Sequence, residues 1–479
     1  MPQKPLDLIL LMTTRTRATI FWFFVFLFIV GGTGTILFVS GYRLNLETGK
    51  MEKVGGAFVK TNIPNYDVTL DGKHFSKQYA VTNELFIPSL TPGTYTFEVK
   101  KEGYRSWKKQ FTVLPRIVTS FKSTLLIPNP LTPESLFQKI FELKSFSISK
   151  NTANILLPDP REKSLTLYSL DAGDVIKTIK EKDAQRITWL SDNTSFFYTT
   201  PTTKSILFVS GEKTINVTTA FPRSLSSIAS SIKSTIANIY PHPFEKKLII
   251  QTVKNGVYVF DPFTAQSVLL TDINPLTVTV QGSSIIFLDN KGQLYSEHLI
   301  TKNVNKLTLE PLSSVTSHAK DQWNILISPD EKTFVLSNVT SRELFISTKE
   351  TGKFSLLDTN ATSPSFAFDS RKLAYTKGNT PILYWIVKDE ESRKEEGQKD
   401  TLYVELPVTN LTWYRDNAHL FGYTSEKELY FFETDNRTPL ETLLISTDVP
   451  DYFYHEDSNT LFYLNSGNLL KLDFNFSKN

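Results

Sequence analysis

The stretch NILISPDEKTFVLSN, residues 324–338, consists of two short apolar runs separated by the polar turn Ser-Pro-Asp-Glu-Lys. Pro329 presets its own backbone angle, and an Asp side chain in a turn bonds the backbone two residues on. The pattern therefore predicts a strand, a tight turn and a second strand. The following run ELFISTK predicts a third strand. Such a unit cannot bury both of its faces alone, so we expect similar units beside it.

Seven further stretches repeat this frame of strand, short polar turn and strand. Marked at their turns, the eight units lie at Ser149, Ser191, Pro243, Gly282, Pro329, Asp369, Arg415 and Glu456. A period of about 43 residues with three or four strands is typical of the blades of a β-propeller. We therefore predict a mostly β chain with a seven- or eight-bladed propeller over residues 135–479. Eight blades are favoured, and seven are expected if the divergent unit at Gly282 is not a blade.

The last unit supplies only three strands, at residues 452–455, 460–465 and 468–474. The segment SLFQKIFEL, residues 135–143, precedes the first unit and has no blade of its own. An unpaired sheet edge exposes backbone hydrogen-bonding groups. We therefore expect this segment to pair with the final blade and close the ring.

The units resemble the WD40-like repeats of TolB-type propellers, which carry a Ser-Pro-Asp turn. Residues 328–330 are the closest copy of that turn, whereas the other units keep the hydrophobic frame without the tripeptide. The resemblance implies a propeller fold and, by itself, no particular activity.

Residues 54–128 show a different pattern of six short alternating strands. In LTPGTYTFEVKKEGYRSWKKQFTV, residues 90–113, the side chains of Tyr95, Phe97 and Val99 alternate with polar ones, which predicts one buried and one wet face. Six strands in so short a segment predict a small all-β sandwich. The Pro-rich residues 129–134 then form a stiff linker to the propeller.

This segment resembles a PEGA domain, a small bacterial surface module. The match rests on GAFVKT, on VTLDG at residues 68–72, and on the run PG-x-Y-x-F-x-V-x-K-x-GY. The Pro-Glu-Gly-Ala stretch that names the family reads Pro-Asn-Tyr-Asp here, at residues 64–67. The resemblance implies an attachment module of the cell envelope without catalytic residues.

Residues 18–40, ATIFWFFVFLFIVGGTGTILFVS, contain no charge. A helix of this length spans a hydrocarbon core of about 30 Å. An uncleaved transmembrane anchor is favoured over a signal peptide, whose apolar stretch is shorter, and over a buried soluble helix. The basic residues flanking the span tie in number. Arg15 and Arg17 lie closest to it, so residues 1–17 are expected in the cytoplasm and the remainder outside, as a single-pass protein of the cell membrane.

The composition excludes several classes of chemistry. Fifty-two basic residues are scattered among 49 acidic ones, which is unlike the basic face of a nucleic-acid-binding protein. The absence of cysteine excludes disulfides, thiolate zinc sites and a cysteine nucleophile. No G-x-S-x-G elbow or phosphate-binding loop occurs. We therefore predict no catalytic residues, no metal, no cofactor and no enzyme activity.

Some polar residues still raise questions of function. The six histidines, none at zinc-binding spacing, are His74, His242, His298, His318, His419 and His455. His242 and His455 occupy equivalent turns, and ordinary surface histidines are favoured there over a shared axial site. The turn carboxylates Asp192, Asp330, Asp369, Asp416 and Asp457 are expected to bond the backbone two residues on. Residues 289–292 (DNKG) are interpreted as a hairpin turn rather than a calcium loop.

Residues 388–400, KDEESRKEEGQKD, interrupt one blade with ten charges of mixed sign. Such a run is expected to form a solvated hairpin extension, with a partner-binding arm as the less favoured alternative.

Two hypotheses for function follow. The first is a non-enzymatic, membrane-anchored envelope protein whose PEGA-like domain and propeller bind or scaffold a protein or cell-wall glycan. The alternative is a propeller enzyme, a hydrolase or lyase acting on envelope glycan, with two or more carboxylates converging in the channel. A solute sensor that signals across the membrane is disfavoured, because 17 residues leave no room for a cytoplasmic signalling domain. The identity of the partner and its binding residues are not given by the sequence.

Overall fold

The computed structural model describes residues 13–44, 49–75, 83–137, 143–181, 183–226, 235–254, 256–318, 320–390 and 392–476. The chain divides into two compact units. The first comprises Met1–Asn129 with Arg437–Pro439, and the second comprises Pro130–Asn436 with Leu440–Asn479. The predominance of strands agrees with the predicted fold class.

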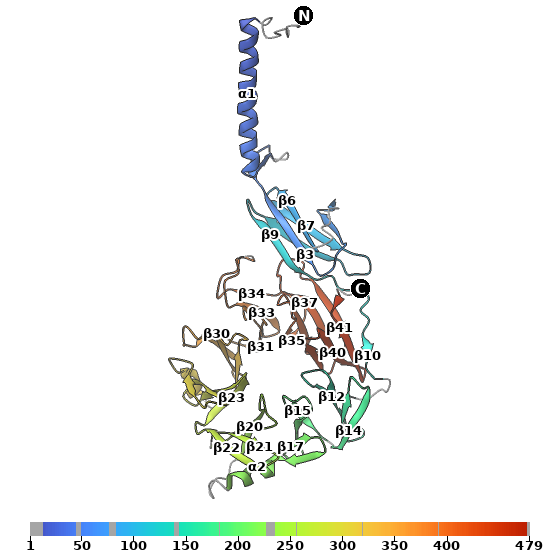
Figure 1. The fold of residues 1–479 in the computed structure, drawn as a ribbon, viewed down its shortest axis with the longest axis vertical. Coiled ribbons are helices and arrows are strands. Elements are labelled where there is room, and N and C mark those ends of the chain that lie inside the picture. Colours follow the sequence, from blue (N-terminus) through green and yellow to red (C-terminus); the bar gives the residue numbers. More distant parts are fainter. Residues whose placement is uncertain are drawn as a thin grey trace, which may run out of the picture. The chain divides into compact units, whose positions relative to one another are not determined.

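Helix α1 (Thr14–Val39) opens unit 1 and is long and apolar enough to cross a membrane (Figure 1). It begins four residues before the predicted span, because the Thr13 side chain caps it by accepting a hydrogen bond from the Thr16 amide at 3.3 Å. The Thr35 hydroxyl donates to the Gly31 carbonyl at 2.8 Å, so this polar group is satisfied within the helix. None of the helix side chains is buried against the described protein.

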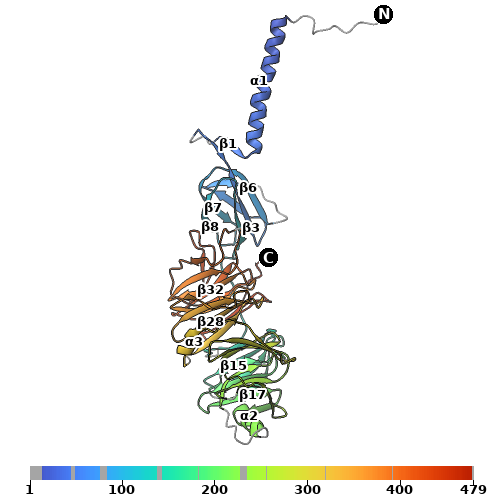
Figure 2. The same ribbon diagram turned by 90° about the vertical axis from the view of Figure 1, so that its left-hand side faces the viewer.

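A short antiparallel hairpin follows the helix (Figure 2). Strand β1 (Tyr42–Leu44) pairs with β2 (Met51–Lys53), with Arg43 opposite Glu52. The amide of Val54 then donates to the Gly41 carbonyl at 2.9 Å. The chain therefore returns to the end of α1 before the sandwich begins.

The rest of unit 1 is the predicted sandwich, made of two sheets with strand orders β6-β3-β9 and β5-β4-β7-β8. Its strands are β3 (Gly55–Thr61), β4 (Asp67–Leu70), β5 (Lys73–Phe75), β6 (Glu84–Leu90), β7 (Gly93–Lys100), β8 (Trp107–Val113) and β9 (Val118–Thr124). The six expected strands are all present, and the three-residue β5 adds a seventh among the described residues. Strands β3 and β9 pair in parallel, with Ala57 opposite Thr119.

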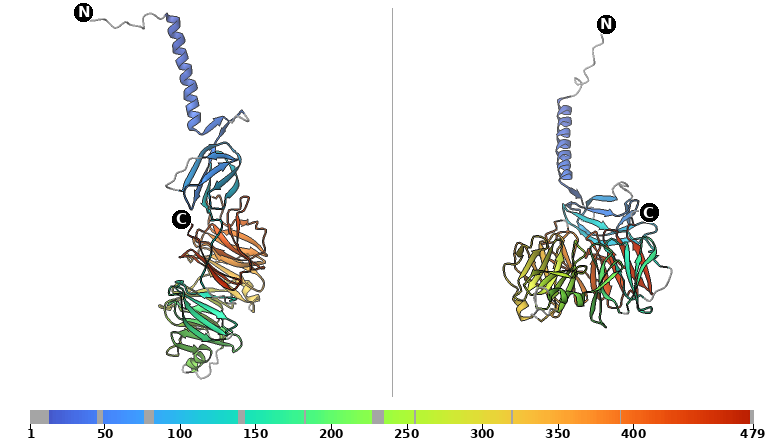
Figure 3. Two further views of the ribbon diagram at one scale, coloured as in Figure 1. Left: turned by 90° about the vertical axis from the view of Figure 1, so that its right-hand side faces the viewer. Right: turned by 60° about the horizontal axis from the view of Figure 1, so that its bottom comes forward.

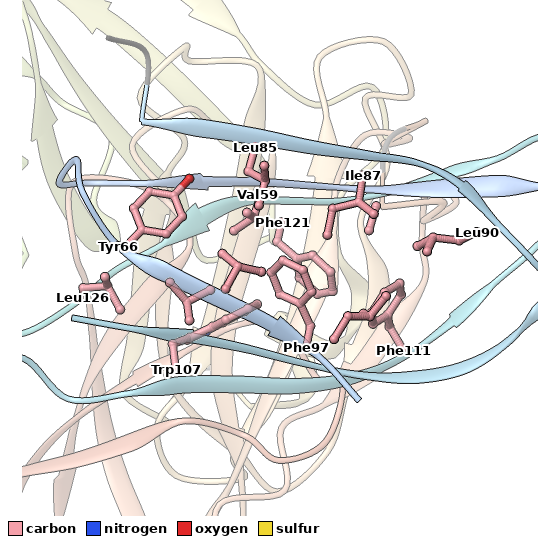
Figure 4. Close-up of a cluster of buried hydrophobic side chains, with 14 of the residues drawn as sticks. Val59, Tyr66, Leu85, Ile87, Leu90, Phe97, Trp107, Phe111, Phe121 and Leu126 are labelled. Carbon is pink, nitrogen blue, oxygen red and sulfur yellow. The ribbon is translucent and has the colours of Figure 1, made fainter. Parts of the chain in front are cut away.

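Aromatic rings fill the space between the two sheets (Figure 4). The ring of Phe97 stacks on that of Phe121 with 5.7 Å between centroids, and Trp107 meets Phe121 edge-on at 5.1 Å. Phe97 and Val99 are fully buried and Tyr95 is partly buried, so the predicted alternation in β7 is confirmed. Gly55 is required at the edge of this core, because a Cβ there would lie 2.4 Å from the Leu114 carbonyl oxygen.

Unit 1 also holds a buried lysine. Lys109 in β8 has no exposed surface, and its Nζ donates to the carbonyl oxygens of Arg437 and Pro439 at 2.7 Å each. The Gln110 amide donates to the Thr438 carbonyl at 2.7 Å. Backbone oxygens therefore satisfy the ammonium group away from solvent.

Unit 2 is a β-propeller in which four-stranded sheets follow one another around a ring (Figures 1 and 3). Within the described residues, blades 1 to 4 consist of β11 (Ser147–Ile148), β12 (Asn154–Asp159), β13 (Ser164–Ser169) and β14 (Asp174–Lys180); β15 (Gln185–Trp189), β16 (Phe196–Thr200), β17 (Ser205–Ser210) and β18 (Lys213–Asn216); β19 (Ile236–Pro241), β20 (Leu248–Thr252), β21 (Val257–Asp261) and β22 (Gln266–Thr271); and β23 (Pro275–Gln281), β24 (Ser284–Asp289), β25 (Leu294–His298) and β26 (Val304–Lys306).

Blades 5 to 8 complete the ring. They consist of β27 (Trp323–Ile327), β28 (Thr333–Asn338), β29 (Glu343–Thr348) and β30 (Ser355–Asp358); β31 (Ala361–Phe366), β32 (Lys372–Lys377), β33 (Thr380–Trp385) and β34 (Lys399–Thr401); β35 (Val408–Trp413), β36 (His419–Thr424), β37 (Leu429–Glu433) and β38 (Thr442–Ser446); and β39 (Tyr452–His455), β40 (Thr460–Asn465), β41 (Asn468–Asp473) and β10 (Glu134–Ser135). The described part of the chain thus has eight blades, and the unit at Gly282 is blade 4.

The ring closes as predicted, through a strand from the start of unit 2. Strand β10 pairs antiparallel with β41, with Ser135 opposite Leu470, and the Leu136 amide donates to the Leu469 carbonyl at 3.1 Å. The pairing begins one residue earlier than expected. Phe137 and Leu143 are buried in the apolar cluster between blades 8 and 1, whereas residues 138–142 lie outside the described part of the chain.

Each pair of neighbouring blades is joined by buried side chains. Phe208 of blade 2 packs with Leu248 and Phe260 of blade 3, and similar clusters join the other pairs. Blades 7 and 8 meet through the rings of Phe421 and Tyr454, whose centroids are 4.9 Å apart. Face-to-face burial between sheets therefore stabilises the ring, as the repeat predicted.

Among the described residues of the propeller, two short helices lie between blades, and neither was predicted. Helix α2 (Val217–Ser226) buries Val217, Phe221 and Leu225 in the cluster between blades 2 and 3. Helix α3 (Ser313–Ser317) buries Val315 between blades 4 and 5.

Candidate functional site

The inner strands of the propeller surround the ring axis and are therefore candidates for a binding site. The first strand of each blade is the inner one, since fourth strands such as β14 and β26 are largely exposed at the outer edge. The inner strands are β11, β15, β19, β23, β27, β31, β35 and β39. Within their described residues they contain no Asp or Glu, and Arg186 is the one residue with a permanent charge.

The exposed side chains of these strands are mostly neutral hydrogen-bonding groups. They are the amides of Gln185, Asn238, Asn324 and Asn410, together with Arg186, Ala237 and the ring of Phe453, which is 37% exposed. Amides, a guanidinium and an aromatic ring can bind polar or planar groups. They do not supply the facing pair of carboxylates that a glycosidase needs.

The carboxylates lie instead in the turns between the first and second strands. The Asp side chains of four turns each accept a hydrogen bond from the amide two residues on: Asp192 from Thr194, Asp330 from Lys332, Asp369 from Arg371 and Asp416 from Ala418, at 2.8–3.2 Å. The predicted structural role of these four residues is confirmed. Asp457 is exposed in the turn of blade 8. There the hydrogen bond from a turn amide, that of Ser458, is accepted by His455 Nδ1 instead.

Asp192 shows how strongly such a turn holds its carboxylate. Burial would raise the pKa of Asp192, but hydrogen bonds from Ser195, Lys246 and Thr194 hold this pKa well below its ordinary value. Its Oδ2 lies 3.0 Å from the Lys246 Nζ of the next blade. The group is therefore ionised and engaged in the framework, and it is a poor candidate for a general acid.

The histidines of these turns also bond locally. His242 Nδ1 accepts hydrogen bonds from the Phe244 and Glu245 amides, and burial lowers the His242 pKa. The expectation of a surface histidine is wrong here, since His242 is only 5% exposed. The buried imidazole is accommodated because its Nδ1 accepts hydrogen bonds from the turn amides, as the Asp carboxylate does in other turns. His455 is partly exposed, and its Nε2 lies 2.9 Å from the Lys150 carbonyl oxygen of blade 1.

The other four histidines are separate from one another in sequence, and one of them, His419, contacts a turn carboxylate. His419 lies in blade 7 with its Nδ1 at 2.6 Å from Asp416, and its ring stacks on Phe431. His298 Nδ1 accepts from the Ile300 and Thr301 amides. His318 follows α3, and His74 lies in β5 of unit 1. No cluster of three or more metal-ligating side chains occurs in the described residues.

Hydrogen bonds link the turns of neighbouring blades. The contacts are Asn151 amide to Asn193 Oδ1 (blades 1 and 2), Lys246 to Asp192 (2 and 3), Asp330 amide to Ser370 Oγ (5 and 6), Asp369 amide to Asn417 Oδ1 (6 and 7), Arg415 amide to Tyr454 Oη (7 and 8) and His455 to the Lys150 carbonyl (8 and 1). The polar side chains of these turns therefore have a structural role, because they connect neighbouring blades.

The charged segment at residues 388–400 follows β33 of blade 6, and its last two residues belong to β34. Most of its described charged side chains are exposed; that of Glu390, for example, is 87% exposed. Lys394 folds back onto Asp400 at 2.9 Å, and Asp400 accepts a hydrogen bond from the Trp385 indole at 2.7 Å. The segment is thus a solvated extension whose base is fixed to the blade.

The turn at residues 289–292 is a hairpin, as interpreted from the sequence. Asp289 Oδ1 accepts from the Lys291 and Gln293 amides at 2.9 and 2.8 Å. Gly292 has a φ of +85°, and a Cβ there would lie 2.2 Å from the Leu312 carbonyl oxygen. The carboxylate is used by its own turn, as in other Asx turns.

Fold and site together define an eight-bladed propeller that follows a small β-sandwich and an apolar helix in the chain. No family model and no curated protein matches this chain. Solved structures similar to it include Sqt1 of Saccharomyces cerevisiae, with 12% identity, a TM-score of 0.46, and coverage of 71% of this chain and 98% of that one. Hsv2 of Kluyveromyces marxianus has 11% identity, a TM-score of 0.41, and coverage of 64% and 98%. The β-propeller domain of Swd1 from Myceliophthora thermophila has 8% identity, a TM-score of 0.39, and coverage of 71% and 99%.

Proposed function

We propose that this chain is a non-enzymatic, membrane-anchored protein of a bacterial cell envelope whose propeller is a binding scaffold for a protein or cell-wall glycan. In this proposal α1 is a transmembrane anchor, and the PEGA-like sandwich stands next to it outside the cytoplasm. The resemblance to PEGA and TolB-type modules is what suggests the envelope. The apolar length of α1 supports the anchor.

The observation that carries the scaffold proposal is that the propeller places its carboxylates and its neutral polar groups in different positions. The turn carboxylates cap their own turns, and the inner strands present amides, Arg186 and Phe453. A rigid ring that exposes neutral hydrogen-bonding groups and one cation suits recognition of polar or anionic groups. The glycan-hydrolase alternative needs two facing carboxylates, and no described observation favours it.

The test uses the full chain, immobilised in detergent and incubated with purified cell wall or with solubilised envelope proteins. We expect one of these fractions to be retained without chemical change. Arg186→Asn should weaken retention about tenfold, because it removes the cation of the inner strands while Asn tolerates the φ of +49° found there. Asp171→Asn, in an exposed outer turn, is the matched control.

Two results would contradict the proposal. Release of soluble sugar or peptide fragments from the wall would show an enzyme. Equal retention by the Arg186→Asn variant and the wild type would place the binding surface away from the inner strands.

A further inference from the structure

The first residues after α1 fold onto the end of the sandwich instead of forming a free linker. The Val54 amide bonds the Gly41 carbonyl, and the Arg116 amide bonds the Val54 carbonyl, both at 2.9 Å. Arg43 donates to the Phe38 carbonyl of α1 at 2.9 Å and to Ser89 Oγ at 3.4 Å. The helix end, the β1–β2 hairpin and the turn before β9 are therefore contiguous.

We define the helix-proximal surface as residues 41–44, 49–54 and 114–118. Four large apolar side chains are exposed on it: Leu44 (55%), Met51 (46%), Leu114 (40%) and Val118 (43%). Single exposed apolar residues are ordinary on a protein surface. Four of them beside the end of an apolar helix indicate that a partner with an apolar part covers this surface.

The same surface is basic. It carries Arg43, Lys50, Lys53 and Arg116 against a single described carboxylate, Glu52. The Arg43 guanidinium lies 3.6 Å over the Phe38 ring, and the Lys53 Nζ lies 5.0 Å from the Tyr42 ring. Cations and aromatic rings mixed with apolar side chains match the region of a bilayer where phosphates meet acyl chains.

The proximity to α1 decides which partner fits. The helix ends at Val39, so Gly41 and Tyr42 lie within about 10 Å of its end. If α1 spans a bilayer, the surface that begins at these residues is next to the headgroups. A peptide or second chain would compete there with lipid for the same positions. An anionic phospholipid layer supplies both the phosphates for the cations and the apolar boundary for Leu44, Met51 and Leu114.

We propose that the helix-proximal surface rests on anionic phospholipid headgroups and fixes the sandwich against the membrane. The inference depends on the proposed anchoring of α1. It adds a second membrane contact, made by the folded domain itself.

The test exploits the absence of cysteine from the chain. Single cysteines at Leu114→Cys, Phe28→Cys in α1 and Tyr403→Cys in the propeller are labelled with an environment-sensitive fluorophore. The full-length protein is reconstituted in phosphatidylcholine vesicles, with or without phosphatidylglycerol, that contain a spin-labelled quencher lipid. Phe28 and Tyr403 are 79% and 81% exposed in the described protein, so neither label disturbs a core.

We expect quenching at positions 28 and 114 but not at 403. Quenching at 114 should increase about twofold when phosphatidylglycerol is present, because each nearby cation is attracted to the anionic surface. The double variant Lys50→Gln, Arg116→Gln should lose this increase while quenching at 28 stays unchanged.

The outcomes separate the two proposals. Quenching at 28 without quenching at 114 would leave the anchor intact and overturn the lipid contact. No quenching at either position would overturn both. Disulfide cross-linking of two chains through Leu114→Cys, without quenching, would show that a second copy covers the surface and would also overturn the lipid contact.

Discussion

At the scale of single residues, Glu297 is a carboxyl group that its surroundings accommodate poorly. It lies in β25 of blade 4 with 1% of its surface exposed, and its Oε2 accepts no hydrogen bond from the described residues. Burial raises the Glu297 pKa, Lys302 partly opposes this, and Asp272 adds to it. An isolated buried carboxylate is costly, so the neutral acid suits this position better.

We therefore expect Glu297→Gln to stabilise the protein at neutral pH. Because the folded-state pKa is raised, the stability that the protonated Glu297 provides is complete below its unfolded-state pKa and is lost as the pH rises through the folded-state value. The variant should melt about 2 °C higher than the wild type at pH 7.5 and equally at pH 4. Calorimetry at both pH values measures this, with Glu350→Gln in an exposed turn as control. A lower melting temperature at pH 7.5 would mean that the carboxylate has a stabilising partner.

Several residue-level roles were predictable from the sequence, and others were not. The capping role of Asp192 and Asp416 follows from the turn chemistry of Asp alone. The burial of His242 does not, because the sequence does not show that an imidazole nitrogen can replace the Asp oxygen. The sequence does not single out the inner-strand residue Arg186, since a single basic residue in a strand carries no signal before the blades are assembled around an axis.

At the scale of elements, the seams between blades combine apolar packing with a few ionic contacts. Asp358 of β30 accepts a hydrogen bond from Tyr375 Oη at 2.8 Å and lies 2.7 and 3.1 Å from the Nζ atoms of Lys377 and Lys399. Burial alone would raise the Asp358 pKa, but these partners lower it to about 2. These contacts therefore connect β30, the outer strand of blade 5, with blade 6.

Asp358→Asn is expected to destabilise the protein by about 1–2 kcal/mol at pH 7, allowing for the partial exposure of both lysines. Because the folded-state pKa is lowered, the stability is present above the unfolded-state pKa near 4 and is lost as the pH falls towards about 2. Urea unfolding at pH 7 and pH 2.5 compares the variant with wild type, using Asp171→Asn as control. Equal stability of variant and wild type at pH 7 would show that the cluster contributes nothing.

Strands were easier to predict than their partners or the short helices. Alternation in β7 reveals a strand, but nothing in it shows that β3 pairs in parallel with β9. Helix α2 has β-branched residues and Pro222 in its sequence, so its helical propensity is poor. Burial of Phe221 and Leu225 between blades 2 and 3 overrides that propensity, and only the assembled ring supplies it.

At the scale of the whole molecule, the eight-fold repeat and the closing strand were both readable from the sequence. The hydrophobic frame recurs even in blade 4, where the turn is reduced to Gly282 and Ser283. The missing strand of the last unit pointed to a donor from the start of the propeller, and β10 is that donor.

A disulfide across the closure should stabilise the ring. Ser135 and Leu470 are directly opposite, so Ser135→Cys with Leu470→Cys introduces the only cysteine pair of the chain. Oxidation is expected to add about 3 kcal/mol, because it joins distant parts of the unfolded chain. Thermal unfolding with and without reductant measures the effect, and Ser135→Cys alone is the control. A bond that forms without raising the melting temperature would contradict the closing role of β10.

The same closure sets the order of events during synthesis. Strand β10 leaves the ribosome first among the propeller strands, yet its partner β41 comes more than three hundred residues later. Blades 1 to 7 have all emerged before the final sheet has all four of its strands. The outer edge of blade 8 is therefore completed only after translation has passed residue 471, and if α1 directs the chain across a membrane, the ring is sealed on the far side.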